Sequence, residues 1–342
     1  MPHTIVPFIS IKKAKKDATF SIDEDFRNDS SDRKVNLSVG AYKSEEGKAV
    51  ILKSVKQAEQ KVLEGETNKD YLPMSGLKSF TEGARQVLFS GSVESSKIAS
   101  IQTLSGTGAL RVGFEFLAGF GRKVAYVPQQ TWANHHAIIK AAGLELREYK
   151  YLDTENMRLD FEGMMGDLRM APAGSVVVLH MCGHNPTGQD LNEREWEEVH
   201  ALMEERSLLP FFDAAYQGFT SGDLDRDAYS LRLFASAGPT ELLVAQSFSK
   251  NMGLYGERAG CLHIVVPDEA ATVPVHSQAS LVARRIWSNP PMHGAKIAAE
   301  IFSNDDLLAL WKSEVEEMAE RMNKMRRLLV SNLEKHCTFR EW

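Results

Sequence analysis

One lysine stands where its amine could act as a nucleophile. Lys250 lies in the segment SFSKNMGLYGERAG, residues 247–260, directly after an apolar run that predicts a buried strand. A lysine in that place loses solvation, which lowers its pKa and favours the neutral, nucleophilic amine. Ser247, Ser249 and Arg258 stand nearby in the sequence, and hydroxyl groups and a guanidinium are suited to bind a phosphate. A solvated surface loop is the alternative, and the segment by itself leaves the two interpretations about equal.

A second segment has the small residues that an anion site needs. The sequence SGTGA at 105–109 opens a predicted helix, where Ser105, Gly106 and Thr107 would offer hydroxyl and free N–H groups to an anion. Arg111 stands at the third glycine position of the dinucleotide fingerprint, which argues against a nicotinamide-binding domain. Taken alone, the segment favours a simple helix start.

Polar and aromatic side chains also follow other predicted strands. The carboxyl ends of strands are where α/β folds bind ligands. A carboxylate there could pair with a cationic ring nitrogen, and a tryptophan could stack on a planar ring. Each residue also has an ordinary explanation as a turn cap, a turn or a core residue. The segments are FFDAAYQGF at 211–219 with Asp213 and Tyr216, HNPTG at 184–188 with Asn185, and TWANHH at 131–136 with Trp132 and His135.

Together these residues are the parts of a pyridoxal phosphate site. A phosphate cup, an aromatic face, an anchoring carboxylate, a tyrosine hydroxyl and an activated lysine would all serve that cofactor. Lys250 would form a Schiff base with it. Asp213 would keep the pyridine nitrogen protonated, so that the ring accepts electrons from the α-carbon of the substrate.

The elements that must position these residues alternate between strands and helices from about residue 40 onward. Continuous apolar runs predict strands that are buried on both faces, as in a parallel or mixed sheet covered by helices. A helix is predicted at 191–207, and an amphipathic helix at 305–336 that is long enough to pass from one domain into another. The predicted strands are 124–128, 175–181, 209–216, 241–248 and 261–266.

Composition narrows the function classes. The 342 residues are 43% hydrophobic and 25% charged, enough for one large domain and a smaller one. A net charge of −6 makes a nucleic-acid binder a poor candidate, and no apolar run approaches the roughly 18 residues of a membrane span. The three cysteines are far apart, which predicts no metal site and indicates a reducing compartment. We expect a cytoplasmic location, with a mitochondrial one left open.

Seven motifs in order resemble the aspartate aminotransferases, pyridoxal phosphate enzymes of fold type I, with the animal-like eukaryotic branch nearest. The resemblance implies an α/β fold with a large, doubly wound, mostly parallel sheet domain at 46–309. It also implies a smaller α/β domain from both chain ends, 16–45 and 310–342, and an arm at 1–15 that wraps the partner subunit. The motifs, which span roughly residues 20–340, are NLSVGAY, YLPMSGL, SGTGA, HNPTG, FFDAAYQGF, SFSKNMGLYGERAG and RRIWSNPP.

The resemblance further implies an activity. The amino group would pass between L-aspartate and 2-oxoglutarate in a ping-pong reaction that gives oxaloacetate and L-glutamate. The enzyme would be a homodimer with shared active sites. Two alternatives remain: an aminotransferase that also accepts aromatic amino acids, and a truncated, catalytically weak relative that binds pyridoxal phosphate.

Each site residue receives a role from the resemblance. Lys250 matches the Schiff-base lysine, which also moves a proton between the α-carbon of the substrate and the cofactor. Asp213 matches the partner of the pyridine nitrogen, with His135 behind it. The remaining matches are Asn185 and Tyr216 to the residues that bond the ring hydroxyl oxygen, Trp132 to the stacking aromatic, and Ser105, Gly106, Thr107, Ser247, Ser249 and Arg258 to the residues around the phosphate.

Two matched residues would act in the neighbouring subunit. Tyr71 matches a tyrosine that reaches the partner's cofactor phosphate. Arg284, three residues before Trp287, matches an arginine that crosses the interface and binds the side-chain carboxylate of the substrate. Without the following WSNPP, an exposed basic pair on a helix would be the better interpretation. Gly40 matches a backbone contact near a substrate carboxylate, and Trp132 and Asn185 also match substrate contacts.

The chain departs from the family at a few places. Ser38 stands where glycine is usual, and Gly183 where alanine is common. The family's C-terminal end, which carries the arginine for the substrate α-carboxylate, is expected to be missing. Arg340 lies in the wrong context to replace it. We therefore expect a fragment or a truncated form, and a truncated form should bind substrate poorly.

Overall fold

The computed structural model describes residues 7–16, 18–38, 40–238 and 241–336. These belong to two compact units, residues 1–50 and residues 51–342. The smaller unit contains a 3-10 helix, η1 (Phe8–Ser10), a helix, α1 (Ala18–Asn28), and a β-bridge between Lys43 and Ala49. In this unit Asp23 of α1 accepts a hydrogen bond from Asn36 Nδ2 at 2.7 Å, which fastens the helix to the segment that follows it.

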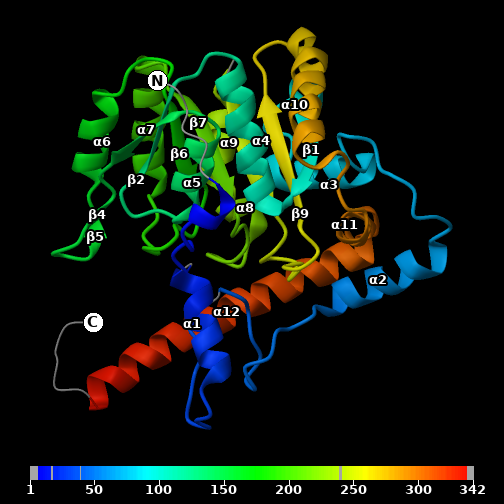
Figure 1. Ribbon diagram of the computed structural model, residues 1–342, viewed down its shortest axis with the longest axis vertical. Coiled ribbons are helices and arrows are strands. Elements are labelled where there is room, and N and C mark those ends of the chain that lie inside the picture. Colours follow the sequence, from blue (N-terminus) through cyan, green and yellow to red (C-terminus); the bar gives the residue numbers. More distant parts are fainter. Residues whose placement is uncertain (1–6, 17, 39, 239–240, 337–342) are drawn as a thin grey trace. The chain divides into compact units, whose positions relative to one another are not determined.

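A seven-stranded sheet forms the centre of the larger unit (Figure 1). Its order is β1-β9-β8-β7-β6-β2-β3, and the neighbouring pairs are parallel except those that β9 makes with β1 and β8. The predicted α/β fold with a large, mostly parallel sheet is therefore confirmed. The strands are β1 (Ile98–Leu104), β2 (Val124–Pro128), β3 (Glu145–Tyr149), β6 (Val176–His180), β7 (Leu209–Ala214), β8 (Leu242–Ser247) and β9 (Ala259–Val265), with β4 (Leu152–Asp153) and β5 (Arg158–Leu159) in a separate antiparallel pair.

Helices cover both faces of the sheet. Helices α4, α5 and α10 contribute to one hydrophobic cluster, and α3, α6, α7 and α9 to the other. The helices are α2 (Lys53–Gly65), α3 (Lys78–Phe89), α4 (Ser105–Gly119), α5 (Asn134–Ala141), α6 (Phe161–Arg169), α7 (Glu193–Glu205), α8 (Leu224–Asp227), α9 (Tyr229–Ser236), α10 (Thr272–Trp287), α11 (His293–Ser303) and α12 (Asp305–His336), with 3-10 turns η2 (Ser95–Lys97) and η3 (Glu269–Ala271).

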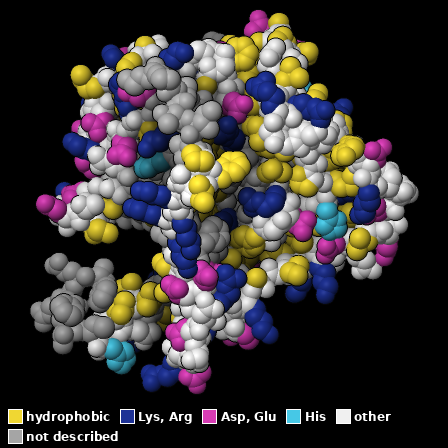
Figure 2. All heavy atoms as spheres, viewed as in Figure 1, with side chains coloured by type: hydrophobic (Ala, Val, Ile, Leu, Met, Phe, Trp, Pro, Cys, Tyr) yellow, Lys and Arg dark blue, Asp and Glu magenta, His cyan; other side chains and the backbone are white. Residues whose placement is uncertain are grey.

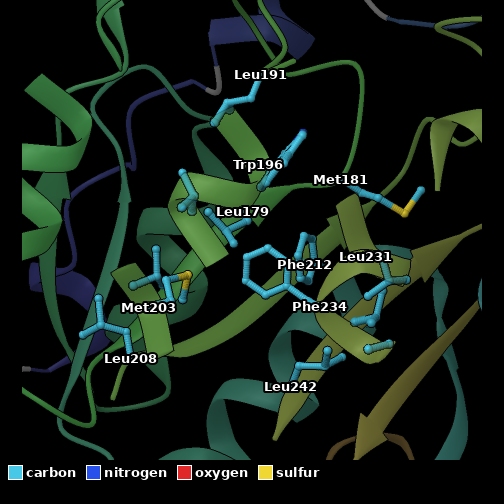
Figure 3. Packing of buried hydrophobic residues seen from close by; sticks show 14 of the residues in the cluster. Leu179, Met181, Leu191, Trp196, Met203, Leu208, Phe212, Leu231, Phe234 and Leu242 are labelled. Carbon is cyan, nitrogen blue, oxygen red and sulfur yellow. The ribbon is translucent and has the colours of Figure 1, made fainter. Parts of the chain in front are cut away.

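In each central strand, alternate side chains pack into one hydrophobic cluster or the other. Phe211 packs on the side of α4, whereas Phe212 packs on the opposite side with Trp196 and Phe234 (Figure 3). The rings of Phe212 and Phe234 meet edge to face, with centroids 5.1 Å apart. Because both faces are covered, β2, β6, β7, β8 and β9 are mostly apolar, which is why their sequences predict buried strands.

The predicted strands at 124–128, 175–181, 209–216, 241–248 and 261–266 correspond to β2, β6, β7, β8 and β9, within two residues at each end. Sequence analysis did not predict β1 or β3. β1 interleaves Ser100, Gln102 and Thr103 with apolar residues, and the edge strand β3 is largely exposed. The predicted helix at 191–207 is α7, which begins with a capping box formed by Asn192 and Glu195.

The predicted helix at 305–336 is α12, and its first half is fastened to the rest of the larger unit. Glu314 accepts hydrogen bonds from the backbone N–H groups of Lys53 and Ser54, at 2.6 and 3.1 Å, and so caps α2. The buried Trp311 donates from Nε1 to Asn251 O at 2.7 Å. The proposed domain boundary at residue 310 falls inside this helix, and the division into domains stays a prediction.

Basic and acidic side chains are interspersed on the face shown in Figure 2, rather than separated into fields of one sign. In the described part of the chain, no helix has both the length and the apolar character that a membrane span requires.

Candidate active site

Most of the predicted site residues gather at the edge of the sheet where the parallel strands end. Ser105 follows β1, Asp213 lies near the end of β7, and Ser247 ends β8. β9 runs in the opposite direction, so its first residues lie beside these ends, with Gly260 opposite Ser247. This arrangement brings together segments that are far apart in the sequence, at the edge where α/β folds bind ligands.

Three serine hydroxyl groups form a cluster at this edge. Ser105 Oγ lies 2.8 Å from both Ser247 Oγ and Ser249 Oγ. Gly106 and Thr107 follow in the first turn of α4, whose leading N–H groups have no acceptor within the helix. Hydroxyl groups and helix N–H groups that converge in this way suit a phosphate.

Close backbone approach shapes the same cluster. Ser105 donates from its backbone N–H to Arg258 O at 3.0 Å, and both residues have a positive φ, of 58° and 56°. A Cβ on Gly260 would lie 2.6 Å from the backbone of Ser105, so this contact requires a glycine. The strained conformations and the glycine bring the Arg258 segment against the start of α4.

Lys250 lies half-buried beside this cluster. Its burial lowers its pKa from the usual lysine value, and the charge of Arg258 lowers it further. Its Nζ is 5.0 Å from the ring centroid of Tyr255 and 6.0 Å from that of Tyr216. A lowered pKa makes more of the neutral amine available, which supports the predicted nucleophilic character.

Asp213 is held as a carboxylate in a buried position. Burial alone would raise its pKa, but the hydrogen bond from His135 and the nearby rings of His135 and His180 lower the pKa below the usual aspartate value. His135 Nε2 lies 3.0 Å from Asp213 Oδ2. The ring of Trp132 stands perpendicular to that of His135, with centroids 5.3 Å apart. The predicted pairing of Asp213 with His135 is therefore present in the structure.

A chain of hydrogen bonds extends behind Asp213. His180 Nδ1 accepts from the backbone N–H of Asn185 at 3.2 Å, and burial lowers the pKa of His180 well below its usual value. The neutral ring therefore carries its hydrogen on Nε2, which donates to Thr131 Oγ1 at 3.2 Å. Thr131 in turn directs its hydrogen to His135 Nδ1 at 2.8 Å, which leaves Nε2–H of His135 to donate to Asp213. Every donor in this assignment points toward the carboxylate.

Asn185 and Tyr216 also meet at the site. Asn185 Nδ2 donates to the hydroxyl oxygen of Tyr216 at 3.4 Å. Burial raises the pKa of Tyr216, and the charge of Asp213 raises it further, so the hydroxyl group stays protonated. Gly183 packs behind this tyrosine with a φ of 62°, and a Cβ on it would lie 3.1 Å from Tyr216 Cβ.

Replacing Gly183 by alanine is expected to lower the free energy of unfolding by about 1 to 3 kcal/mol, because the positive φ and the contact with Tyr216 both disfavour a side chain. Urea unfolding monitored by circular dichroism would measure this. Gly166→Ala is the matched control, since this helical glycine has open space around it and a normal φ. Equal stability of the wild type and Gly183→Ala would contradict the prediction.

Three predicted residues are not part of this cluster. Tyr71 lies in the segment between α2 and α3 and is 86% exposed. Arg284, near the end of α10, is also exposed and donates from Nη1 to Ser288 Oγ. Gly40 belongs to the smaller unit. Their predicted roles concern substrate contacts and the partner subunit, and those roles stay predictions.

Sequence analysis missed several residues that build the site. Thr131 and Gly260 stand in segments that sequence analysis did identify, 131–136 and 247–260, but neither was given a role, and His180, which ends β6, was not named. Tyr255, whose ring lies near Lys250 Nζ, stands in a segment that sequence analysis did identify. The signal for His180 was its place at the end of a strand, which becomes informative once the strand order is known.

A family model described as aminotransferase class I and II matches residues 32–341. The chain belongs to this family. Members of the family act with pyridoxal phosphate on amino acids and oxo acids.

Individual relatives indicate the activity more specifically than the family model does. The chain is 44% identical over 340 residues to the cytoplasmic aspartate aminotransferase of Oryza sativa subsp. japonica, covering 98% of this chain and 83% of the relative. A putative aspartate aminotransferase from Leishmania major Friedlin superposes with a TM-score of 0.95 at 40% identity, covering 98% of this chain and 84% of that one. The aromatic-amino-acid aminotransferase from Burkholderia pseudomallei, covalently bound to pyridoxal phosphate, has a TM-score of 0.94 at 36% identity and coverages of 98% and 85%. The first two of these comparisons support aspartate aminotransferase function.

The residues at the sheet edge fit pyridoxal phosphate. The serine hydroxyl groups and the start of α4 suit its phosphate, and Asp213 supplies a buried carboxylate for a protonated ring nitrogen. Lys250 supplies an amine of lowered pKa, with its Nζ 6.0 Å from the centroid of the Tyr216 ring. The chemistry of the donor set therefore matches the cofactor of the family.

Proposed function

We propose that the chain transfers the amino group between L-aspartate and 2-oxoglutarate by a ping-pong mechanism, giving oxaloacetate and L-glutamate. The observation that carries the proposal is the half-buried Lys250, whose pKa is lowered by burial and whose Nζ lies 6.0 Å from the centroid of the Tyr216 ring. The similarity to aspartate aminotransferases over nearly the whole chain supports the choice of substrates.

The proposal gives each residue of the cluster a task. Bound pyridoxal phosphate supplies a ring that withdraws electrons from the α-carbon of the substrate. Lys250 would hold the cofactor covalently through Nζ, and its free amine would carry the α-carbon proton. Asp213 would keep the proton on the pyridine nitrogen, and His135 would keep Asp213 ionised. Asn185 and Tyr216 would bind the ring hydroxyl oxygen, and Trp132 would stack on the ring. The residues that would bind the phosphate are Ser105, Gly106, Thr107, Ser247, Ser249 and Arg258.

We further propose a homodimer in which Tyr71 and Arg284 act in the active site of the partner. Both side chains are exposed, and so are the apolar Met74, Leu281 and Ile286, which a partner subunit would cover. Gly40 would contact the substrate, and the arm at 1–15 would contact the partner.

We also propose a cytoplasmic location. Three findings bear on it: the relatives include cytoplasmic enzymes, they also include mitochondrial ones, and the chain has few cysteines. Fractionation of cells that express the tagged full-length protein would test this, and co-purification with mitochondria would contradict it.

A single half-reaction tests the proposed activity. The purified chain is loaded with pyridoxal phosphate, freed of excess cofactor, and mixed with L-aspartate in the absence of an oxo acid. We expect at most one equivalent of oxaloacetate per subunit, because the amino group stays on the enzyme. After the remaining L-aspartate has been removed, adding 2-oxoglutarate should release at most one equivalent of L-glutamate. Oxaloacetate production that requires both substrates together would exclude the ping-pong mechanism.

Replacing Arg284 by leucine is expected to lower kcat/KM for L-aspartate by about a thousandfold, because a bidentate contact to the side-chain carboxylate is lost. The loss for L-phenylalanine should be much smaller. Steady-state kinetics with both amino acids would measure the difference. Arg285→Leu is the control, since this neighbouring arginine instead pairs with Glu115 at 3.8 Å. Equal losses for the two substrates would remove the proposed role of Arg284.

A broader substrate range is the second candidate. The similarity to an aromatic-amino-acid aminotransferase at a TM-score of 0.94 favours it. The same kinetics decide the question, because a broad enzyme would process L-phenylalanine and L-aspartate with comparable kcat/KM before any substitution.

A further inference from the structure

Two side-chain amides join the segment after α2 to the end of α10. Asn289 donates from Nδ2 to Leu72 O at 2.7 Å. Gln102 donates from Nε2 to Pro291 O at 2.7 Å and accepts from the backbone N–H of Leu77 at 2.9 Å. The segments that carry Tyr71 and Arg284 are therefore tied together, although more than 200 residues separate Leu72 from Asn289.

The segment that carries Tyr71 is fitted closely to Gln102. Gln102 is fully buried, and its backbone N–H donates to Ser75 O at 2.9 Å. Gly76 has a φ of 93°, and a Cβ on it would lie 2.1 Å from Gln102 Cβ. Residues 75–77 are thus held on the sheet, and Asn289 holds the part of the segment next to Tyr71.

The other side of Asn289 leads to Arg284. Asn289 Oδ1 accepts from Ser288 Oγ at 2.7 Å, and Ser288 Oγ accepts from Nη1 of Arg284. Ser288 has a φ of 69°, a conformation that residues other than glycine rarely adopt. Such a conformation persists when its surroundings hold it, and here the two side-chain hydrogen bonds of Ser288 and the one from its backbone N–H to Arg284 O do so. A continuous path of hydrogen bonds joins the guanidinium of Arg284 to the carbonyl group next to Tyr71.

We propose that Asn289 is a positioning residue that fixes Tyr71 and Arg284 as one unit and thereby couples preference for dicarboxylate substrates to retention of the cofactor. The inference rests on the proposed function, in which both side chains serve the partner's active site. A guanidinium binds a carboxylate through two hydrogen bonds only when both groups are placed within a fraction of an ångström. Loosening the common support of Arg284 and Tyr71 therefore weakens the contacts that both side chains make.

The test is Asn289→Asp in the full chain loaded with pyridoxal phosphate. The change keeps the size and the acceptor for Ser288 but replaces the donor to Leu72 O by an oxygen atom. We expect KM for L-aspartate to rise about tenfold with kcat little changed, KM for L-phenylalanine to stay within about twofold, and the cofactor to be lost several times faster on dialysis against inorganic phosphate. Asn332→Asp is the matched control, because this exposed amide also donates to a backbone carbonyl, Leu328 O, at 2.8 Å. Asn332→Asp should leave both KM values, kcat and the rate of cofactor loss unchanged.

A double substitution shows whether Asn289 acts through Arg284. In the Arg284→Leu background, adding Asn289→Asp should no longer change KM for L-aspartate, while faster loss of the cofactor should persist. If Asn289→Asp raises KM equally for L-aspartate and L-phenylalanine, or changes only the unfolding temperature, the inference is overturned. If Asn289→Asp fails to fold, Asn289→Ser replaces it with the same expectations.

Reference variants separate this inference from the proposed function. Suppose that Arg284→Leu lowers kcat/KM more for L-aspartate than for L-phenylalanine, and that Tyr71→Phe speeds loss of the cofactor. If Asn289→Asp then has neither kind of effect, only the inference is wrong. If Arg284→Leu and Tyr71→Phe themselves have no such effects, their assigned roles are wrong, and the inference is overturned with them.

Discussion

Replacing Lys250 by alanine is expected to lower the rate of L-aspartate turnover by roughly ten-thousandfold or more, because one amine serves as both the covalent anchor and the proton carrier. Oxaloacetate formation measures the loss of turnover. Borohydride reduction followed by peptide mass analysis should attach the cofactor to Lys250 in the wild type and leave Lys250→Ala unmodified.

Two further variants give this prediction its controls. Lys250→Arg keeps a positive charge but has no neutral amine at working pH, so it should be as inactive as Lys250→Ala. Lys78→Ala changes an exposed lysine on α3 and should have wild-type turnover. Substantial activity in Lys250→Ala, or labelling of a different lysine after reduction, would show that the assignment of Lys250 is wrong.

Replacing Asp213 by asparagine is expected to lower kcat by about a thousandfold, since a buried charge is lost where the reaction needs it. The substitution keeps the shape and leaves an acceptor for His135 Nε2–H. Retention of the cofactor should fall less than kcat, because the serine cluster and Lys250 are unchanged. Rapid mixing with L-aspartate would separate the chemical step from binding.

The matched control for this change is Asp160→Asn. Asp160 caps α6 by accepting from the backbone N–H of Gly163 at 3.0 Å, and asparagine caps a helix about as well. This variant should therefore keep both its stability and its kcat. If Asp213→Asn turned over as fast as Asp160→Asn, the carboxylate would have no part in the chemical step.

The central sheet and much of the site were predictable because they depend on local signals. Continuous apolar runs identify β6, β7 and β8, and the residues that follow such strands in a parallel sheet share one edge. Asp213 and Lys250 could be selected on that basis. β3 could not, because an edge strand lacks the apolar pattern that identifies the others.

Contacts between distant segments were not predictable. The chain of hydrogen bonds from Asn185 through Thr131 to Asp213 depends on which strands are neighbours. The hydrogen bond from Asn289 to Leu72 O likewise depends on the path of a segment without regular structure. Neither leaves a periodic pattern in the sequence, since each involves one side chain and one geometry.

The neutral histidines behind Asp213 set a lower pH limit for the folded site. Burial keeps the pKa of His180 well below 6.5 and lowers to about 3 the pKa of His184, whose ring centroid lies 4.2 Å from that of His180. The unfolded chain binds protons at both rings once the pH falls below about 6.5. A depressed pKa in the folded state gives stability that is present above pH 6.5 and declines as the pH falls from there toward the folded-state values. The hydrogen-bond chain that orients the carboxylate thus makes the sheet edge sensitive to acid, because His180 already uses Nδ1 as an acceptor and cannot take a proton there without breaking the chain.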